Sequence, residues 1–442
     1  MPDLTRQIDE EQLIDWLSQQ RWYASKTQEL TGIEILEQAE LDSGLVLALA
    51  QVRFARGTHD LYQLSIAFAH GEVLFDAIAE PAHAQALLAR LQAGEDVPTA
   101  EGRFSFRNPG TMPTTEALAV RPVGKEQTNT SIVFGDQVVL KVFRKFEPGI
   151  NPELEMLRFL TARGFRNIAP LQGWYEYEGP SLNATLGVAQ MFVPDAIDGW
   201  TLALNEIPYY PERFLQRVAE LGTATAELHD VLATNPDDPA FSAEEPSVES
   251  ISLLRATIDE EIEQIFLRLP EDDERLAPIV GRGQEVRERL ATRSQIGTGG
   301  KQIRIHGDYH LGQTMNSPYG WVILDFEGEP ARPLPERRRK RSPLRDVASM
   351  LRSFAYATSA VSLQRGLAVP PDFEERARER FLERYFAEIE RALLPPGEAA
   401  IASLLAIYEL EKAIYELRYE LDNRPDWVQI PVAGIVRLLE EA

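Results

Sequence analysis

The chain contains no cysteine among its 442 residues, which excludes disulfides, zinc–thiolate sites, iron–sulfur clusters and cysteine nucleophiles. Basic residues are also scarce, since 45 Lys and Arg against 69 Asp and Glu give a formal net charge of −24. A charge of this sign repels a phosphate backbone and an anionic membrane surface. Neither nucleic acid nor membrane is therefore an expected partner.

Long apolar stretches are missing as well. No uninterrupted run approaches the roughly 20 residues that a membrane-spanning helix requires. Residues 1–26 include Asp3, Glu10, Glu11 and Asp15 among the apolar positions, a pattern unlike the hydrophobic segment of a signal peptide. We therefore expect a cytoplasmic protein.

Length and periodicity predict three domains in an α+β protein. Residues 1–95 show a helix, three strands and a second helix, typical of a small α+β cap subdomain. Residues 96–200 open with a Gly- and Pro-containing stretch, 93–115, expected to be a linker, and continue as strands, a helix and strands. Residues 201–442 are mainly helical in pattern. Together these predict a bilobal, protein-kinase-like fold behind the cap.

The strongest chemical motif is the run IRIHGDYHLGQ that ends at Gln313. Asp308 and Gln313 have the spacing of the kinase catalytic loop, in which Asp orients the acceptor hydroxyl and an amide five positions later binds metal. Gln replaces the usual Asn but keeps the carbonyl ligand. The loop also holds two of the chain's six histidines, and we predict that His310 contacts the substrate.

A second motif follows this loop. A turn over 317–320 predicts a hairpin whose second strand ends on Asp325. A carboxylate in that position suits a Mg²⁺ ion that bridges ATP phosphates, and Glu327 is a further acidic candidate. A single Asp of this kind is usually a turn or cap residue. The joint pattern nevertheless favours a metal site made by Gln313 and Asp325.

Upstream, the predicted strand VVLK ends on Lys141. It is similar to the strand of kinases whose lysine contacts the α- and β-phosphates of ATP. Alone the pattern is weak, because lysine at a strand end is commonly a solvated edge charge. The following helix offers Glu153 and Glu155 as partners, of which Glu155 is preferred.

The loop before that hairpin has no GxGxxG motif. Thr128, Asn129 and Ser131 offer hydroxyl, amide and backbone groups to phosphates, although an ordinary polar turn explains each of them equally well. Gln190 and Phe192 precede Pro194, where a hinge would present backbone groups to adenine. Packing of a buried strand is the alternative there.

The last long helical pattern combines aromatic and charged residues near one face. Aromatic planes stack on sugar C–H faces, and charged groups bond hydroxyls, so we predict substrate contacts by Lys412, Tyr415, Glu416 and Trp427. Aromatic residues on a helix are more often part of a core.

With these residues placed, the chain resembles the bacterial maltokinases, relatives of the aminoglycoside phosphotransferases. The resemblance rests on QRWYASK (20–26), KVFR (141–144), GINP (149–152), HGDYHLGQ (306–313), DFEGEP (325–330) and the 408–427 region. It implies transfer of the ATP γ-phosphate to the anomeric hydroxyl of maltose, giving maltose 1-phosphate for α-glucan synthesis. It also implies Asp308 as base, Gln313 and Asp325 as Mg²⁺ ligands, and trehalose synthase as a partner of some members.

Two alternatives stay open at this point. A kinase of the same fold could act on glucosamine or an aminoglycoside, whose site should present more unpaired carboxylates. A nucleotide-free pseudokinase scaffold is the alternative from another class, although Lys141, Asp308, Gln313 and Asp325 together count against it.

Overall fold

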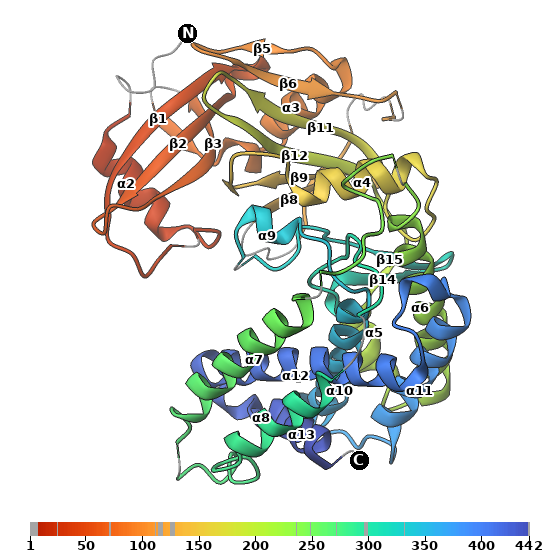
Figure 1. Ribbon diagram of the computed structural model, residues 1–442. Coiled ribbons are helices and arrows are strands. Elements are labelled where there is room, and N and C mark those ends of the chain that lie inside the picture. The colour runs from red at the N-terminus through yellow and green to blue at the C-terminus, as the bar shows by residue number, and fades with distance from the viewer. Residues whose placement is uncertain are drawn as a thin grey trace. The chain divides into compact units, whose positions relative to one another are not determined.

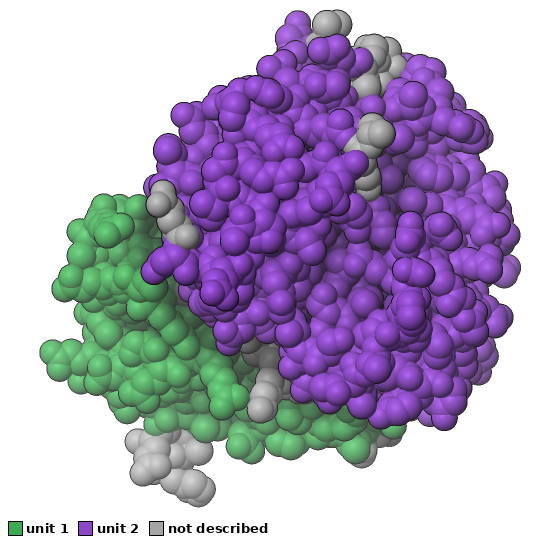
Figure 2. All heavy atoms as spheres, turned by 90° about the horizontal axis from the view of Figure 1, so that it is seen from below, with its two compact units in different colours: residues 1–162, 169–194 green, residues 163–168, 195–442 purple. Residues whose placement is uncertain are grey.

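The structure, a computed structural model, describes residues 8–23, 25–69, 72–110, 112–113, 118–123, 129–235, 237–247, 249–270, 272–295, 299–330 and 332–440. The chain divides into two compact units (Figure 2). Unit 1 comprises residues 1–162 and 169–194, and unit 2 comprises residues 163–168 and 195–442. The sequence predicts three domains, whereas the structure divides into two units; the three-domain division stays a prediction.

Unit 1 contains two antiparallel sheets among its described residues (Figure 1). The first has the order β1-β2-β3-β10, with β4 also paired to β3, and the second has the order β5-β6-β11-β12-β9-β8-β7. The strands of the first sheet are β1 (Leu30–Glu40), β2 (Val46–Phe54), β3 (His59–Ala69), β4 (Glu72–Phe75) and β10 (Lys145–Phe146). Those of the second are β5 (Val97–Pro98), β6 (Arg103–Arg107), β7 (Val120–Pro122), β8 (Asn129–Phe134), β9 (Val138–Phe143), β11 (Leu171–Glu178) and β12 (Asn183–Met191).

The helices of unit 1 pack on these sheets. They are α2 (Glu10–Gln19), α3 (Pro81–Ala93) and α4 (Pro152–Ala162), with short 3-10 turns η1 (Asp42–Gly44) and η2 (Ala77–Ala79). The predicted first helix is therefore present, although Leu4, the first residue of its pattern, lies outside the described residues.

Strand β2 is buried on both faces, which explains its almost continuous apolar sequence. Its alternate residues Leu47 and Leu49 join the core shared with α3 and the second sheet, whereas Ala48 and Val52 face the separate cluster around α2. The first sheet thus separates two hydrophobic cores. It shares one of them with the strands that carry the predicted nucleotide residues.

Short links tie the two sheets of unit 1 together. Strand β10 pairs with β3, and buried Gln63 of β3 donates its side-chain amide to the carbonyls of Phe143 (3.1 Å) and Leu186 (3.0 Å). Buried Arg144 forms an ion pair with Asp76 and donates to Thr130. The cap and the next sheet are consequently one packed unit.

The expected linker over 93–115 is wrong in part. Strand β6 lies inside it, pairs with β11, and buries Phe104 and Phe106 completely in the core. The flanking Gly and Pro residues are typical of a linker and led to this prediction. The segment is a strand because it pairs with β11, whose residues lie about 70 positions later.

Unit 2 is mainly helical, as expected. Its helices are α5 (Gly199–Glu206), α6 (Pro211–Leu232), α7 (Ser250–Phe266), α8 (Gly283–Arg293), α9 (Leu334–Arg337), α10 (Leu344–Arg365), α11 (Phe373–Glu388), α12 (Glu398–Asn423) and α13 (Gln429–Glu440). Its 3-10 turns are η3 (Leu311–Gln313), η4 (Arg391–Leu393) and η5 (Pro425–Trp427). A small sheet has the order β13 (Ile197–Asp198), β14 (Thr314–Ser317), β15 (Gly320–Ile323). In the described part of the chain, no helix combines the length and apolarity needed to cross a membrane.

Two helix pairs in unit 2 position the residues discussed below. Helix α11 packs along α6, and α10 packs along α12. Arg352 of α10, buried to 1% exposure, donates from Nε (2.9 Å) and Nη2 (2.7 Å) to Glu416 of α12. This buried ion pair clamps α10 to α12, because a charge without its partner is costly in the interior.

Candidate active site

The backbone of the predicted catalytic loop is anchored by Asp346, in the first turn of α10. Its carboxylate accepts hydrogen bonds from the N–H groups of His306 (2.7 Å) and Gly307 (2.9 Å). Both bonds are at least partly buried, and Asp346 itself is 1% exposed. The backbone immediately before Asp308 is therefore fixed by hydrogen bonds to a carboxylate that lies about 40 positions later in the sequence.

A buried network supports this carboxylate. Nε2 of His229 on α6 lies 3.3 Å from Asp346, and Nδ1 of His229 lies 2.9 Å from the hydroxyl of Tyr385 on α11. Burial alone would raise the pKa of Asp346, but hydrogen bonds from His229 and the Gly307 N–H hold that pKa below its ordinary value. The anion is thus stabilised inside the helical core.

The side chain of Asp308 faces two groups. Its Oδ1 lies 3.6 Å from Nζ of Lys412 on α12, and its Oδ2 lies 3.9 Å from Nε2 of His310. Burial lowers the pKa of His310, so the neutral imidazole is favoured. Burial also opposes the charge of Lys412, but Asp308 and Glu416 more than offset this and raise the pKa of Lys412.

The hairpin β14–β15 places the backbones of the two predicted metal ligands, Gln313 and Asp325, close together. The N–H of Leu324 donates to the backbone carbonyl of Gln313 (2.9 Å), which places Gln313 beside the residue that precedes Asp325. Asp325 has φ of 61°, in the left-handed region that costs a non-glycine residue energy. Carboxylate oxygens of Asp325 and Glu327 lie within 4.8 Å of each other.

This donor set fits Mg²⁺. Carboxylate and amide oxygens are the ligands that hard divalent cations prefer. The two neighbouring carboxylates of Asp325 and Glu327 favour the binding of a cation. Gln313, Asp325 and Glu327 are the residues of unit 2 that would hold such an ion. When bound, Mg²⁺ would supply positive charge to the phosphates of ATP.

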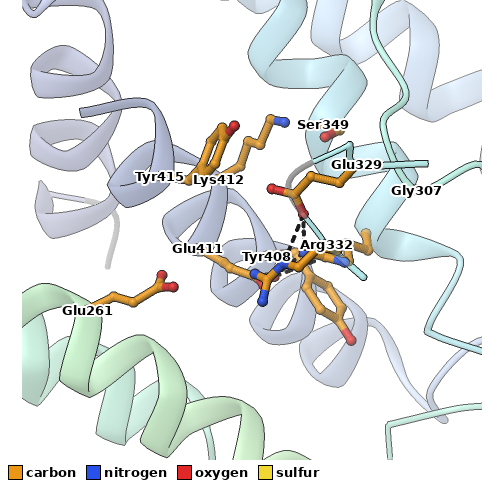
Figure 3. Close-up of a pocket in the computed structure, with 10 residues that line it drawn as sticks. Glu261, Gly307, Glu329, Arg332, Ser349, Tyr408, Glu411, Lys412 and Tyr415 are labelled. Atoms are coloured by element: carbon orange, nitrogen blue, oxygen red, sulfur yellow. Dashed lines mark hydrogen bonds and ion pairs between the residues drawn. The ribbon is translucent and has the colours of Figure 1, made fainter. Parts of the chain in front are cut away.

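Next to the catalytic loop lies a pocket of about 450 Å³, partly open to solvent (Figure 3). It is lined by Glu261, Gly307, Glu329, Arg332, Arg345, Ser349, Tyr408, Glu411, Lys412 and Tyr415. Because Gly307 and Lys412 both neighbour Asp308, the pocket borders the predicted base.

Ion pairs occupy most of the charged groups in the pocket. Arg345 pairs with Glu411 (3.0 Å) and lies 4.0 Å from Glu329, which also pairs with Arg332 (3.3 Å). Glu261 reaches in from α7, and Figure 3 draws no hydrogen bond or ion pair from it to the other residues shown. Burial raises the pKa of Glu261. An ammonium group next to it would therefore satisfy a partly desolvated carboxylate.

The two tyrosines of the pocket come from the same face of α12, one at each end of the lining segment. Burial raises the pKa of Tyr408 to about 12 and also raises the pKa of Tyr415. Both hydroxyls therefore stay protonated at neutral pH. Tyr408 and Tyr415 add aromatic side chains to the pocket lining.

Of the residues predicted to contact substrate, some lie at the pocket or beside Asp308 and others do not. Lys412 and Tyr415 line the pocket, and His310 lies beside Asp308. Glu416 is 7% exposed, with its carboxylate bound by Arg352, and Trp427 stacks on Tyr356 at 6.1 Å between ring centroids. Glu416 and Trp427 do not line the pocket described above.

We expect the Glu416→Gln substitution to lower the free energy of unfolding by about 1–3 kcal/mol, because buried Arg352 would lose its anionic partner. Sugar-dependent kcat should change less than about twofold, because the glutamine carbonyl still accepts a hydrogen bond from Arg352 and keeps α10 linked to α12. Urea unfolding and steady-state kinetics measure the two quantities. Glu388→Gln, which removes an exposed helix ion pair, is the control. A stable variant with lost activity would place Glu416 at the substrate instead.

In unit 1, Lys141 on β9 forms an ion pair with Glu153 at 2.7 Å. The sequence favoured Glu155, so this preference is corrected. Glu153 lies in the first turn of α4, where its backbone N–H is capped by the side chain of Asn151 (2.8 Å), and it is 1% exposed. The packing of α4 on the sheet decides which of the two glutamates faces Lys141.

The other predicted nucleotide residues also belong to unit 1. Thr128 lies outside the described residues, Asn129 begins β8, and Ser131 pairs with Lys141 across β8 and β9. Gln190 donates its side-chain amide to the carbonyl of Ala169 (3.0 Å). The N–H of Phe192 donates to the carbonyl of Gln137 (2.9 Å). Their roles toward ATP remain predictions.

Two family models match this chain. Residues 16–99 match the maltokinase N-terminal cap domain, and residues 119–329 match the phosphotransferase enzyme family. The second match contains Lys141, Asp308, Gln313 and Asp325, so every residue assigned above to phosphate, base or metal falls inside it.

Characterised relatives cover most of the chain. A glucosamine kinase of Mycolicibacterium smegmatis is 26% identical over 74% of this chain and 81% of its own length. A glucosamine kinase of Streptacidiphilus jiangxiensis is 25% identical over 83% of this chain and 82% of its own length.

Solved structures show the same fold. A glucosamine kinase (crystal form B) superposes with a TM-score of 0.75 at 20% identity, covering 96% of this chain and 97% of that one. A glucosamine kinase in complex with glucosamine, ADP and inorganic phosphate gives a TM-score of 0.72 at 20% identity, over 96% and 98% of the two chains. The α+β, protein-kinase-like fold with an N-terminal cap and a helical C-terminal region is thereby confirmed. The chain thus carries a maltokinase N-terminal cap domain followed by a domain of the phosphotransferase enzyme family.

Proposed function

We propose that this phosphotransferase is a sugar kinase that moves the γ-phosphate of ATP directly to a sugar hydroxyl. In this reaction the hydroxyl oxygen forms a bond to γ-phosphorus, the bond to the β–γ bridging oxygen breaks, and ADP leaves. Asp308 orients the hydroxyl and accepts its proton. The observation that carries the proposal is the placement of Asp308 beside a pocket lined by tyrosines, carboxylates and cations.

The acceptor that we propose is maltose, phosphorylated at its anomeric hydroxyl to give maltose 1-phosphate. The resemblance of the motifs and the matched cap domain support this choice. We further propose Mg²⁺, held by Gln313 and Asp325, as the cofactor, contact of Lys141 with the ATP phosphates, and a cytoplasmic location. Trehalose synthase is proposed as a partner on the resemblance alone.

Glucosamine is the second candidate acceptor. The characterised relatives described above are named glucosamine kinases. In this chain, Glu261 is a pocket carboxylate from which Figure 3 draws no ion pair to the other residues shown. A protonated amino group would neutralise Glu261, whereas maltose offers only hydroxyls.

The deciding experiment is ADP release with MgATP across maltose, trehalose, glucose, glucosamine and kanamycin. Product should then be identified by ³¹P NMR, because a phosphate on the anomeric oxygen is distinguished there from one on another hydroxyl. We expect the highest kcat/KM with maltose. Preference for glucosamine would replace maltose with the second candidate. A protein that neither binds nucleotide nor releases ADP with any acceptor would be a scaffold, contrary to the proposal.

Glu261→Gln provides a test of the second candidate. If glucosamine is an acceptor, its KM should rise about tenfold, the effect of losing one charge-assisted hydrogen bond worth about 1.4 kcal/mol. The KM for maltose should change less than about threefold, since a glutamine still bonds hydroxyls. Glu263→Gln, an exposed glutamate on the same helix, is the matched control. An unchanged KM for glucosamine would exclude Glu261 from amine recognition.

A further inference from the structure

The two carboxylate oxygens of Asp308 have different surroundings. Oδ1 lies 3.6 Å from the ammonium of Lys412 and Oδ2 lies 3.9 Å from Nε2 of His310, so both contacts are within ion-pair distance and longer than a hydrogen bond. Burial lowers the pKa of His310 and favours its neutral form, so Lys412 is the cation of these two neighbours. Oδ1 thus faces a cation, whereas Oδ2 faces a neutral ring.

Lys412 is itself held in place. Its side chain is 25% exposed, and its Nζ lies 5.1 Å from the ring centroid of Tyr415, a cation–π distance. Glu416, one turn further along α12, is occupied by Arg352. Both carboxylates favour the charge of Lys412, but its ion pair is with Asp308, whereas Glu416 is paired with Arg352.

Helices α10 and α12 contact both the backbone before Asp308 and the side chain of Asp308. Asp346 of α10 holds the backbone before Asp308, and Lys412 of α12 contacts its side chain. The Arg352–Glu416 pair ties α10 to α12. A carboxylate whose backbone and one oxygen are both tied to a clamped helix pair has little freedom to rotate, which is what preorganisation of a base requires.

We propose that Lys412 is a positioning residue for Asp308. It fixes Oδ1 through the ion pair and leaves Oδ2 to accept the hydrogen bond, and then the proton, of the sugar hydroxyl. This inference rests on the proposed sugar kinase activity. It differs from the substrate contact expected at Lys412, because a residue that acts through Asp308 affects turnover more than sugar affinity.

The test is a double-mutant cycle with Lys412→Met, Asp308→Asn and the combined variant, assayed with MgATP and the best acceptor. We expect Lys412→Met to lower kcat about tenfold while the sugar KM changes less than about threefold. In the Asp308→Asn background the same substitution should cost less than about twofold, because the group through which Lys412 acts is already gone. Lys412→Arg should recover most of the lost kcat.

Lys301→Met removes a lysine that pairs with Glu245 elsewhere in unit 2 and should leave kcat unchanged. Should the methionine variant fail to fold in thermal melts, Lys412→Gln and Lys412→Arg carry the same comparison. Losses that multiply in the combined variant, or a loss confined to KM, would overturn the inference. A wild-type protein that phosphorylates no sugar would instead refute the proposed function itself.

Discussion

Asp308→Asn should lower kcat by about 10² or more, the usual contribution of a positioned general base. The amide keeps the size of the carboxylate but cannot accept the hydroxyl proton, and it replaces the partner of Lys412 with a neutral group. The dissociation constant for ATP, measured by calorimetry with Mg²⁺, should change little. Steady-state ADP release with the best acceptor gives kcat.

The matched control is Asp426→Asn, because Asp426 has a side chain that is 97% exposed and pairs only at the surface with Arg275. This variant should retain wild-type turnover, since exposed ion pairs contribute little. Near-normal kcat in Asp308→Asn would remove Asp308 from the role of base. Loss of ATP affinity together with turnover would indicate a general defect in folding rather than in chemistry.

Asp346→Ala should damage both stability and turnover. Removing the carboxylate leaves the buried N–H groups of His306 and Gly307 without their acceptor and His229 without its anion. We expect the free energy of unfolding to fall by about 3 kcal/mol. The loop before Asp308 would also shift, and a misplacement of about 1 Å is enough to lower kcat about 10²-fold.

Asp259→Ala is the comparison for this variant, because it also removes an aspartate from a helix of unit 2 but breaks only a partly exposed pair with Arg287. Its cost should stay below about 1 kcal/mol. Denaturant unfolding and kinetics at a temperature where both variants are folded separate the two effects. A stable, fully active Asp346→Ala protein would show that the loop holds its conformation without this anchor.

Much of the candidate site could be predicted from local sequence. Asp308, Gln313 and Asp325 are predicted together because the loop and the following hairpin are contiguous, so that spacing along the chain translates directly into distance. Lys412 and Tyr415 are predicted together because positions three or four apart share a helix face, and both line the pocket. The same rule places Tyr408 and Glu411 in the pocket lining.

Residues that meet only through packing gave no comparable signal. Asp346 and Glu261 come from helices α10 and α7, where a charged residue in a helical pattern is ordinarily a solvated face. The preference for Glu155 over Glu153 failed because spacing along α4 does not reveal the rotation of that helix against the sheet. Strand β6 was hidden for a similar reason, since its partner β11 lies far along the chain.

The amino-acid sequence by itself determined the class of the protein and the chemistry-bearing loop, because periodicity and motif spacing are properties of neighbouring residues. Tertiary structure decided which carboxylate holds the catalytic loop, which glutamate meets Lys141, and that Lys412 reaches Asp308. Each of these contacts joins segments far apart in sequence, and burial gives each its strength by removing competing water.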